Sequence, residues 1–111
     1  MMRAELSARW AEGQDVVVPT ELTYRPGEPV EVVVRKRSWR FDISDGGRAV
    51  ELAGRPTSWA EVAERVVAAH ALNVNRRGVV FVQSNEVRLE GLVERVADCS
   101  AALFQELLEH E

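Results

Sequence analysis

An alternation of apolar and polar residues between residues 30 and 35 restricts the fold of this chain more than any other feature. Val30, Val32 and Val34 would point to one face of a β-strand. Glu31 and Arg35 would point to the other face. A strand with one apolar and one polar face is typical of an antiparallel sheet that is covered on one side. We therefore predict such a sheet, with the valines in its core.

Two further strands are predicted directly after this one. Trp39, Phe41 and Ile43 alternate with polar residues, so the pattern places Trp39 on the buried face. Residues 45–47, Asp-Gly-Gly, are typical of a tight turn because glycine adopts a positive φ without steric cost. The alternation resumes over residues 50–52. The sequence therefore predicts a three-strand meander in which residues 45–47 join two strands and form no phosphate-binding loop.

The residues before the meander predict three smaller elements. A four-residue apolar spacing predicts a helix over residues 2–12. The β-branched run 16–18 predicts a strand, which Pro19 closes because proline cannot donate to a sheet ladder. Residues 20–29 contain two prolines and a glycine, and are predicted to form a loop with a turn.

A helix and a hairpin are predicted after the meander. Ser58 and Glu61 form a capping-box pattern at the start of an amphipathic segment that ends near His70. Residues 72–74 and 79–82 then have strand character and are separated by a short polar turn. This pattern indicates a small hairpin.

The last segment predicts a long amphipathic helix. Apolar residues keep a 3.6-residue period from Leu89 to Leu107. The helix could begin at Glu86, capped by Asn85, or later at Gly91. The unbroken apolar stripe from Leu89 favours the earlier start, although an interior glycine costs about 1 kcal/mol relative to alanine.

Together these elements predict an α+β fold, in which a mostly antiparallel sheet, a three-strand meander plus a short hairpin, is packed by two or three helices. The chain has 111 residues, of which 46% are hydrophobic and 29% charged, and we expect one domain over residues 1–111. No apolar run approaches the roughly 20 residues of a membrane span, and none resembles a signal peptide. A cytoplasmic protein with a reduced Cys99 and no membrane association is the expectation.

The order of elements resembles that of a known group of domains. The stretch from Val18-Pro19-Thr20 through the meander to Ser44-Asp45-Gly46 is similar to a bacterial and phage domain family of unknown function. Members have a strand that ends in an Asp-Asp-Gly-type turn, then a helix, a hairpin and a C-terminal amphipathic helix. The resemblance spans residues 16–108 and implies the fold rather than an activity. Ser44 stands where the family tends to have the first acidic residue, so a role for paired carboxylates does not carry over.

Residue types that support catalysis or metal binding are few. A single cysteine excludes an intramolecular disulfide and a multi-cysteine metal site. Cys99 lies on the apolar stripe of the last helix, which favours a core position. Asp42, Asp45 and Glu51 lack the spacing of a calcium-binding loop. We expect no cofactor, no metal and no enzymatic activity, and a hydrolase using Asp42, Asp45 or His70 is the third hypothesis.

The leading hypothesis is a small non-enzymatic interaction or regulatory module that acts through protein contacts. Its candidate surface is the apolar stripe near the end of the last helix, formed by Leu103, Phe104, Leu107 and Leu108. If the sheet is too small to cover this stripe, its exposed part would bind a partner protein or a second copy of the chain. The alternative for these residues is plain core packing.

The second hypothesis is nucleic-acid or anionic-partner binding through basic hairpins. The candidate residues are Arg35, Lys36, Arg37 and Arg40 in the first hairpin and Arg76 and Arg77 in the second. The net charge of -4 lies entirely in residues 57–111, because residues 1–56 have nine basic and nine acidic residues. A basic hairpin beside an aromatic ring can bind phosphates and stack on a base. The alternative is a buried Trp39 and a charged tip that only protects the sheet edge.

Overall fold

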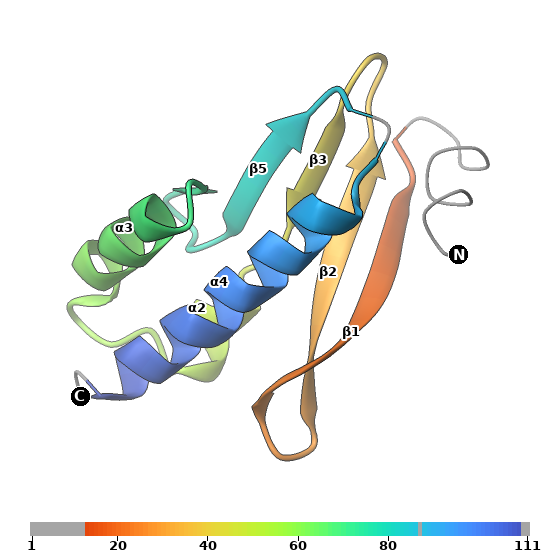
Figure 1. Cartoon of the computed structure of the whole chain (residues 1–111). Helices are drawn as coiled ribbons and strands as arrows, with labels where there is room; N and C mark the ends of the chain where they lie inside the picture. Colours follow the sequence, from red (N-terminus) through yellow and green to blue (C-terminus); the bar gives the residue numbers. More distant parts are fainter. Residues whose placement is uncertain (1–12, 87, 110–111) are drawn as a thin grey trace.

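The computed structural model describes residues 13–86 and 88–109. In that part of the chain, one five-stranded antiparallel sheet is packed by three helices, which confirms the α+β class (Figure 1). The elements are β1 (Asp15–Arg25), β2 (Glu28–Lys36), β3 (Phe41–Ser44), α2 (Arg48–Leu52), α3 (Trp59–Ala69), β4 (Asn73–Val74), β5 (Val80–Ser84) and α4 (Glu90–Glu109). None of the helices among the described residues is both long and apolar enough to cross a membrane. The helix predicted over residues 2–12 lies outside the described residues.

The sheet has the strand order β1-β2-β3-β5-β4. Val34 on β2 pairs with Val16 on β1 and with Ile43 on β3, and Ile43 pairs with Val82 on β5. These residues form one apolar row on the face that the helices cover. The three alternating valines of β2 have no exposed surface, so their predicted orientation toward the core is confirmed.

β1 is longer than the sequence pattern predicts. It runs through Pro19 and pairs again with β2 at Thr23 and Arg25, so most of the loop predicted over residues 20–29 is strand and the turn within it is confirmed. Pro19 is tolerated because β1 lies at the edge of the described sheet, where a strand does not need every amide for pairing. The reversal to β2 is confined to Pro26 and Gly27, and Gly27 has the positive φ of 83° that the turn requires.

The third strand of the predicted meander is a short helix, α2. The turn at residues 45–47 leads from β3 into this helix and not into a strand. Gly46 and Gly47 have φ values of 69° and 79°, and the Gly47 amide donates a hydrogen bond of 2.7 Å to the carboxylate of Asp45. The chain is thereby directed out of the sheet, and the strand beside β3 is β5, which follows much later in the sequence. The predicted hairpin of β4 and β5 is confirmed.

The two long helices follow the predicted segments with changes at their starts. α3 begins after Ser58, whose side chain makes no capping hydrogen bond. α4 begins at Glu90, so the favoured start near Glu86 is wrong and the later alternative is closer. The Glu86 amide donates to Ser84 Oγ in a local turn, whereas the Val93 amide donates to the Leu89 carbonyl in the first turn of α4.

α4 crosses the covered face of the sheet and contacts β1, β2, β3 and β5 as well as both other helices (Figure 1). The helices therefore lie on one face of the sheet. The opposite face has exposed polar residues such as Asp15, Glu31 and Gln83, and it also includes Val17, which is 53% exposed beside Val33. This arrangement leaves the open sheet face, the loops at both ends of the strands and the outer sides of the helices accessible in the described part of the chain.

Candidate functional site

Three of the four residues in the C-terminal apolar stripe belong to the core. Leu103, Phe104 and Leu107 have no exposed surface, and Leu108 alone of the four is 43% exposed. The ring of Phe104 meets that of Tyr24 edge-on, with centroids 5.6 Å apart. The expectation of uncovered helix surface is thus wrong for three of the four residues. β1 reaches to Arg25, so the sheet is large enough to cover the C-terminal half of α4.

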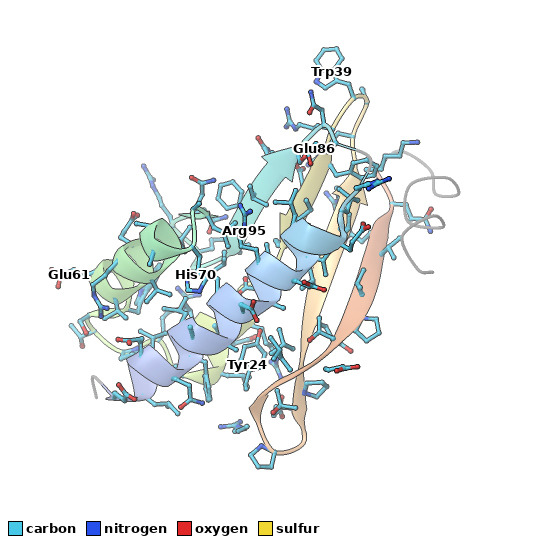
Figure 2. The ribbon with its side chains drawn as sticks, in the orientation of Figure 1. Tyr24, Trp39, Glu61, His70, Glu86 and Arg95 are labelled. Carbon is cyan, nitrogen blue, oxygen red and sulfur yellow. The ribbon has the colours of Figure 1, made fainter. Side chains whose placement is uncertain are left out.

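The connection between β2 and β3 combines an exposed aromatic side chain with a hollow. Residues 37–40, which we call the β2–β3 tip, join the last pair of the ladder, Lys36 and Phe41. The tip is closed by a hydrogen bond of 2.7 Å from the Arg37 amide to the Arg40 carbonyl. Trp39 is 80% exposed and points away from the body of the molecule (Figure 2).

The predicted burial of Trp39 is therefore wrong. The alternation that continues through Phe41 and Ile43 applies to residues in the ladder. Pairing between β2 and β3 ends at Phe41, so Trp39 belongs to the loop and its side chain is not constrained to either sheet face. The indole is therefore accessible to a partner.

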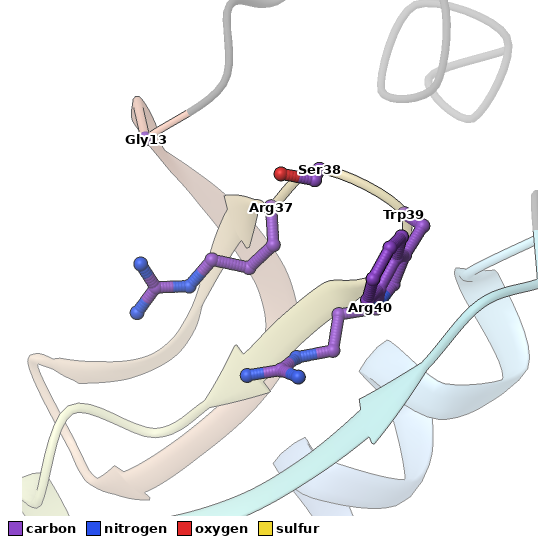
Figure 3. A pocket seen from close by; sticks show the side chains of 5 residues that line it. All are labelled: Gly13, Arg37, Ser38, Trp39 and Arg40. Carbon is purple, nitrogen blue, oxygen red and sulfur yellow. The ribbon is translucent and has the colours of Figure 1, made fainter.

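A hollow of about 340 Å³ lies at this tip (Figure 3). It is lined by Gly13 and by the four tip residues Arg37, Ser38, Trp39 and Arg40. Gly13 is held beside the tip because its amide donates a hydrogen bond of 2.6 Å to the Lys36 carbonyl. Two arginines, a serine, a tryptophan and a glycine thus line one open concavity.

Asp42 orients both tip arginines. Arg37 Nε lies 2.7 Å from Asp42 Oδ2, and Arg40 Nε lies 3.4 Å from Asp42 Oδ1. Each of these bonds uses one of the five N–H donors of a guanidinium group. The arginine side chains are nearly half exposed, while Asp42 is less so. The arrangement holds the two cations in place and leaves donors directed toward solvent.

A second ion pair lies next to the tip on the same end of the sheet. Arg35 binds Asp15 with two hydrogen bonds, of 2.6 Å and 3.0 Å. The guanidinium lowers the pKa of Asp15 below its ordinary value, mainly through the hydrogen bond. With Lys36, the described residues at this end of the sheet include four basic side chains, against the acidic Asp15, Asp42 and Glu86, the last of which is exposed two residues after the end of β5 (Figure 2).

The second basic hairpin lies away from the first. Arg76 and Arg77 belong to the turn that precedes β5, whereas the β2–β3 tip lies beside Ser84 at the end of β5. The length of β5 separates the two sites by roughly 13 Å or more, at 3.3 Å per residue. The structure therefore brings together Arg35, Lys36, Arg37 and Arg40, and it does not add Arg76 and Arg77 to them.

The residues considered for a hydrolase are separated in the structure. Asp42 pairs with the tip arginines, Glu51 with Arg48, and the Nδ1 of His70 lies 3.0 Å from the Val66 carbonyl oxygen. Within residues 13–86 and 88–109, no group of three or more histidine, cysteine or acidic residues could hold a metal ion. Asp45 is buried. The residues form no shared catalytic arrangement.

A buried polar chain links β1, α4 and the turn after β3, and sequence reasoning did not find it. Asp45 is 3% exposed, and its Oδ1 accepts the amides of Gly47 and Val80. Its Oδ2 accepts the Ser100 hydroxyl at 2.6 Å, and Ser100 Oγ lies 2.8 Å from the Tyr24 hydroxyl. The sequence signal that could have indicated it is Ser100, a polar residue on the apolar side of the last helix. The chain is enclosed, so we assign it to stability and not to binding.

Cys99 also belongs to the core, as predicted. It has no exposed surface. Burial, with a smaller contribution from the charge of Asp45, raises the pKa of its thiol to about 12. A thiol that stays protonated and enclosed is a poor nucleophile. The thiol is therefore not part of the candidate site.

Comparison with known proteins identifies no relative of this chain. No family model, no curated protein and no solved structure matches the chain. The similarity of residues 16–108 to a bacterial and phage domain family therefore stays a prediction. The geometry of the β2–β3 tip is the basis for any assignment of function.

Proposed function

We propose that this protein is a small binding module that recognises an anionic partner through its β2–β3 tip. The observation that carries the proposal is the position of Trp39, 80% exposed between Arg37 and Arg40, with both arginines bound to Asp42. A single exposed apolar side chain needs no explanation by itself. An exposed indole flanked by two oriented cations is more specific, because tryptophan and arginine contribute most strongly to binding surfaces.

Asp42 supports the proposal by ordering the site before a partner arrives. A free arginine side chain loses rotamer entropy when it is immobilised, which costs about 0.5–1.5 kcal/mol. The ion pairs to Asp42 cover part of that cost in the unbound protein, because they hold the Nε atoms of Arg37 and Arg40. A partner with anionic oxygens would meet guanidinium groups that are already oriented.

The net charge of the chain does not oppose this function. The total is -4, but charges in water are screened beyond a Debye length of about 10 Å at 0.1 M salt. The charges near the tip therefore contribute most to the potential that an approaching group meets, and among the described residues there the four basic side chains outnumber Asp15, Asp42 and Glu86 by one. The acidic second half of the sequence limits the strength of the attraction and keeps it sensitive to salt.

Chromatography on immobilised heparin tests the proposal, because heparin is a polyanion without bases or apolar side chains. At low salt we expect the wild type to be retained and the double variant Arg37→Gln/Arg40→Gln to elute earlier. Arg76→Gln/Arg77→Gln is the matched control, because it removes the same charge from the opposite end of β5. Equal elution of the two variants, or no retention of the wild type, would refute binding at the tip.

Protein contact through the last helix, the leading hypothesis from the sequence, has little support because most of its candidate residues are buried. Of its four candidate residues, Leu108 alone offers exposed surface. An acidic protein remains one kind of anionic partner that the tip could recognise.

A further inference from the structure

The hollow at the β2–β3 tip offers an unusual combination of groups. Among the described residues, Trp39 is the lone apolar side chain that lines it, beside Arg37, Arg40 and the hydroxyl of Ser38. The tip residues on either side of the indole are exposed or half exposed. The indole therefore stands among polar and cationic neighbours that remain in contact with water.

This setting differs from the anchor of a typical protein interface. Tryptophan hot spots in protein complexes lie in desolvated pockets, within a ring of contacts that excludes water. The core of such an interface is depleted in charged residues, whereas its rim is polar. Within residues 13–86 and 88–109, no other apolar side chain lines the hollow to form that ring around Trp39. A partner that uses the ring face and the cations together fits the tip better.

A single-stranded nucleic acid has that composition. Each unpaired base offers a π-face, and it is flanked along the strand by phosphates. Resting on the proposed function, we infer that the anionic partner is a single-stranded nucleic acid, with one base stacked on Trp39 and the neighbouring phosphates bound by Arg37 and Arg40. Arginine forms paired hydrogen bonds with phosphate oxygens, which suits guanidinium groups already held through their Nε atoms.

The same geometry disfavours a duplex. Bases in a duplex are stacked on one another, so an indole can contact a base face only after unstacking, which costs a few kcal/mol per step. The tip has four residues, of which two are arginines, and so small a contact surface is too little to repay the cost of unstacking a base pair step. Base identity is read through hydrogen bonds to base edges, whereas stacking accepts every base. Single strands should bind with weak sequence preference.

The experiment measures fluorescence anisotropy of three labelled probes with the full chain at low salt. The probes are a single-stranded oligothymidine, a duplex of the same length and a polyglutamate peptide of similar charge. We expect the single strand to bind more tightly than the other two. Trp39→Leu keeps an apolar side chain but removes the π-face, and should weaken binding about 5- to 150-fold, the range for loss of one stacked base. Trp39→Phe keeps a smaller ring and should weaken it less.

Two further measurements separate stacking from simple attraction. Oligothymidine should quench the tryptophan emission of the wild type more than that of Trp39→Phe, because a stacked base contacts the indole. Replacing Arg37 with glutamine should reduce the slope of log affinity against log salt by about 0.7, the value for one phosphate contact on a single strand. The Arg76→Gln/Arg77→Gln control should keep both the affinity and the slope of the wild type. All variants replace accessible side chains, and circular dichroism checks that each one folds.

The outcomes distinguish failure of this inference from failure of the proposed function. Preferential binding of polyglutamate, or equal binding of the duplex, overturns the nucleic-acid inference and leaves an anion-binding tip. Unchanged affinity and unchanged quenching in Trp39→Leu overturn stacking, even if arginine variants weaken binding. Absence of binding to all three probes overturns both proposals. Equal loss in the Arg76→Gln/Arg77→Gln control overturns the location at the tip.

Discussion

Replacement of Asp45 by alanine is expected to lower the free energy of unfolding by about 3–5 kcal/mol. The carboxylate is 3% exposed and accepts hydrogen bonds from the amides of Gly47 and Val80 and from the Ser100 hydroxyl. Alanine would leave these three donors without their acceptor in a buried position. Each buried donor without a partner costs about 1–3 kcal/mol, and rearrangement of Ser100 toward Tyr24 recovers part of the total.

Asparagine at the same position should cost much less. Its Oδ1 can still accept the amides of Gly47 and Val80, and its amide group can donate to Ser100 Oγ, which can then donate to Tyr24. The substitution also removes the cost of burying a charge. We expect Asp45→Asn to destabilise the fold by about 1 kcal/mol near neutral pH, well below the alanine variant.

The cost of Asp45→Asn should depend on pH. Burial raises the pKa of Asp45 above its ordinary value, because desolvation of the carboxylate outweighs the hydrogen bonds from Ser100, Gly47 and Val80. The folded state therefore binds more protons than the unfolded state between the two pKa values. The contribution of this group to stability is full below the ordinary pKa of about 3.9 and is lost as pH rises through the folded pKa. Asparagine does not titrate, so its cost relative to wild type should be larger near pH 4 than near pH 7.

Denaturant unfolding followed by circular dichroism measures these differences. Asp98→Ala on the exposed side of α4 is the matched control and should change stability by less than about 0.5 kcal/mol. A domain of this size has a total stability of roughly 5–15 kcal/mol, so the alanine variant should lose a large part of it. If Asp45→Ala unfolds with a free energy within about 1 kcal/mol of wild type, the donors have found other partners and the reasoning is refuted.

Three further predictions concern other parts of the fold. Asp42→Asn keeps a side-chain oxygen that can accept a hydrogen bond from a tip arginine but removes the negative charge that repels an anion, so the variant should elute from immobilised heparin at higher salt; earlier elution would show that ordering by the carboxylate matters more than its charge. Gly78→Ala should lower the free energy of unfolding by about 1–3 kcal/mol in denaturant titrations, because φ is 85° and a Cβ would lie 3.1 Å from Val50, whereas Gly91→Ala on α4 meets no atom within 4 Å and should not destabilise. Cys99 should stay unlabelled by a water-soluble thiol reagent until the protein unfolds, and rapid labelling of the native protein would contradict its burial.

The secondary structure was largely predictable where periodicity is strong. The alternation in β2 and the helical stripes of α3 and α4 identified the buried faces correctly, because these patterns reflect the geometry of the elements themselves. The third strand of the meander was not predictable in the same way. Residues 50–52 alternate as a strand does, but a short apolar segment fits a strand or one turn of helix equally well. The carboxylate of Asp45 and the positive φ of Gly47 directed these residues into α2.

The candidate site was half predictable. The basic residues of the first hairpin were identified from the sequence, because charge needs no tertiary structure to be recognised. The exposure of Trp39 was not, since it depends on where the β2–β3 ladder stops. The separation of Arg76 and Arg77 from the tip depends on the placement of β5 beside β3, a pairing between segments far apart in the chain. Distance along the sequence contains no information about that pairing.

The sequence by itself determined the class of the fold, the apolar faces of its main elements and the local excess of positive charge. These properties follow from short-range geometry, because the side-chain period of a strand or helix is set by its own backbone. Tertiary structure decided which apolar surface is covered, which polar groups are buried together and which side chains reach solvent. Leu107 is buried and Asp45 accepts a hydrogen bond from Ser100 because elements that are distant in sequence pack against one another. Trp39 is exposed because the pairing of β2 with β3 ends at Phe41.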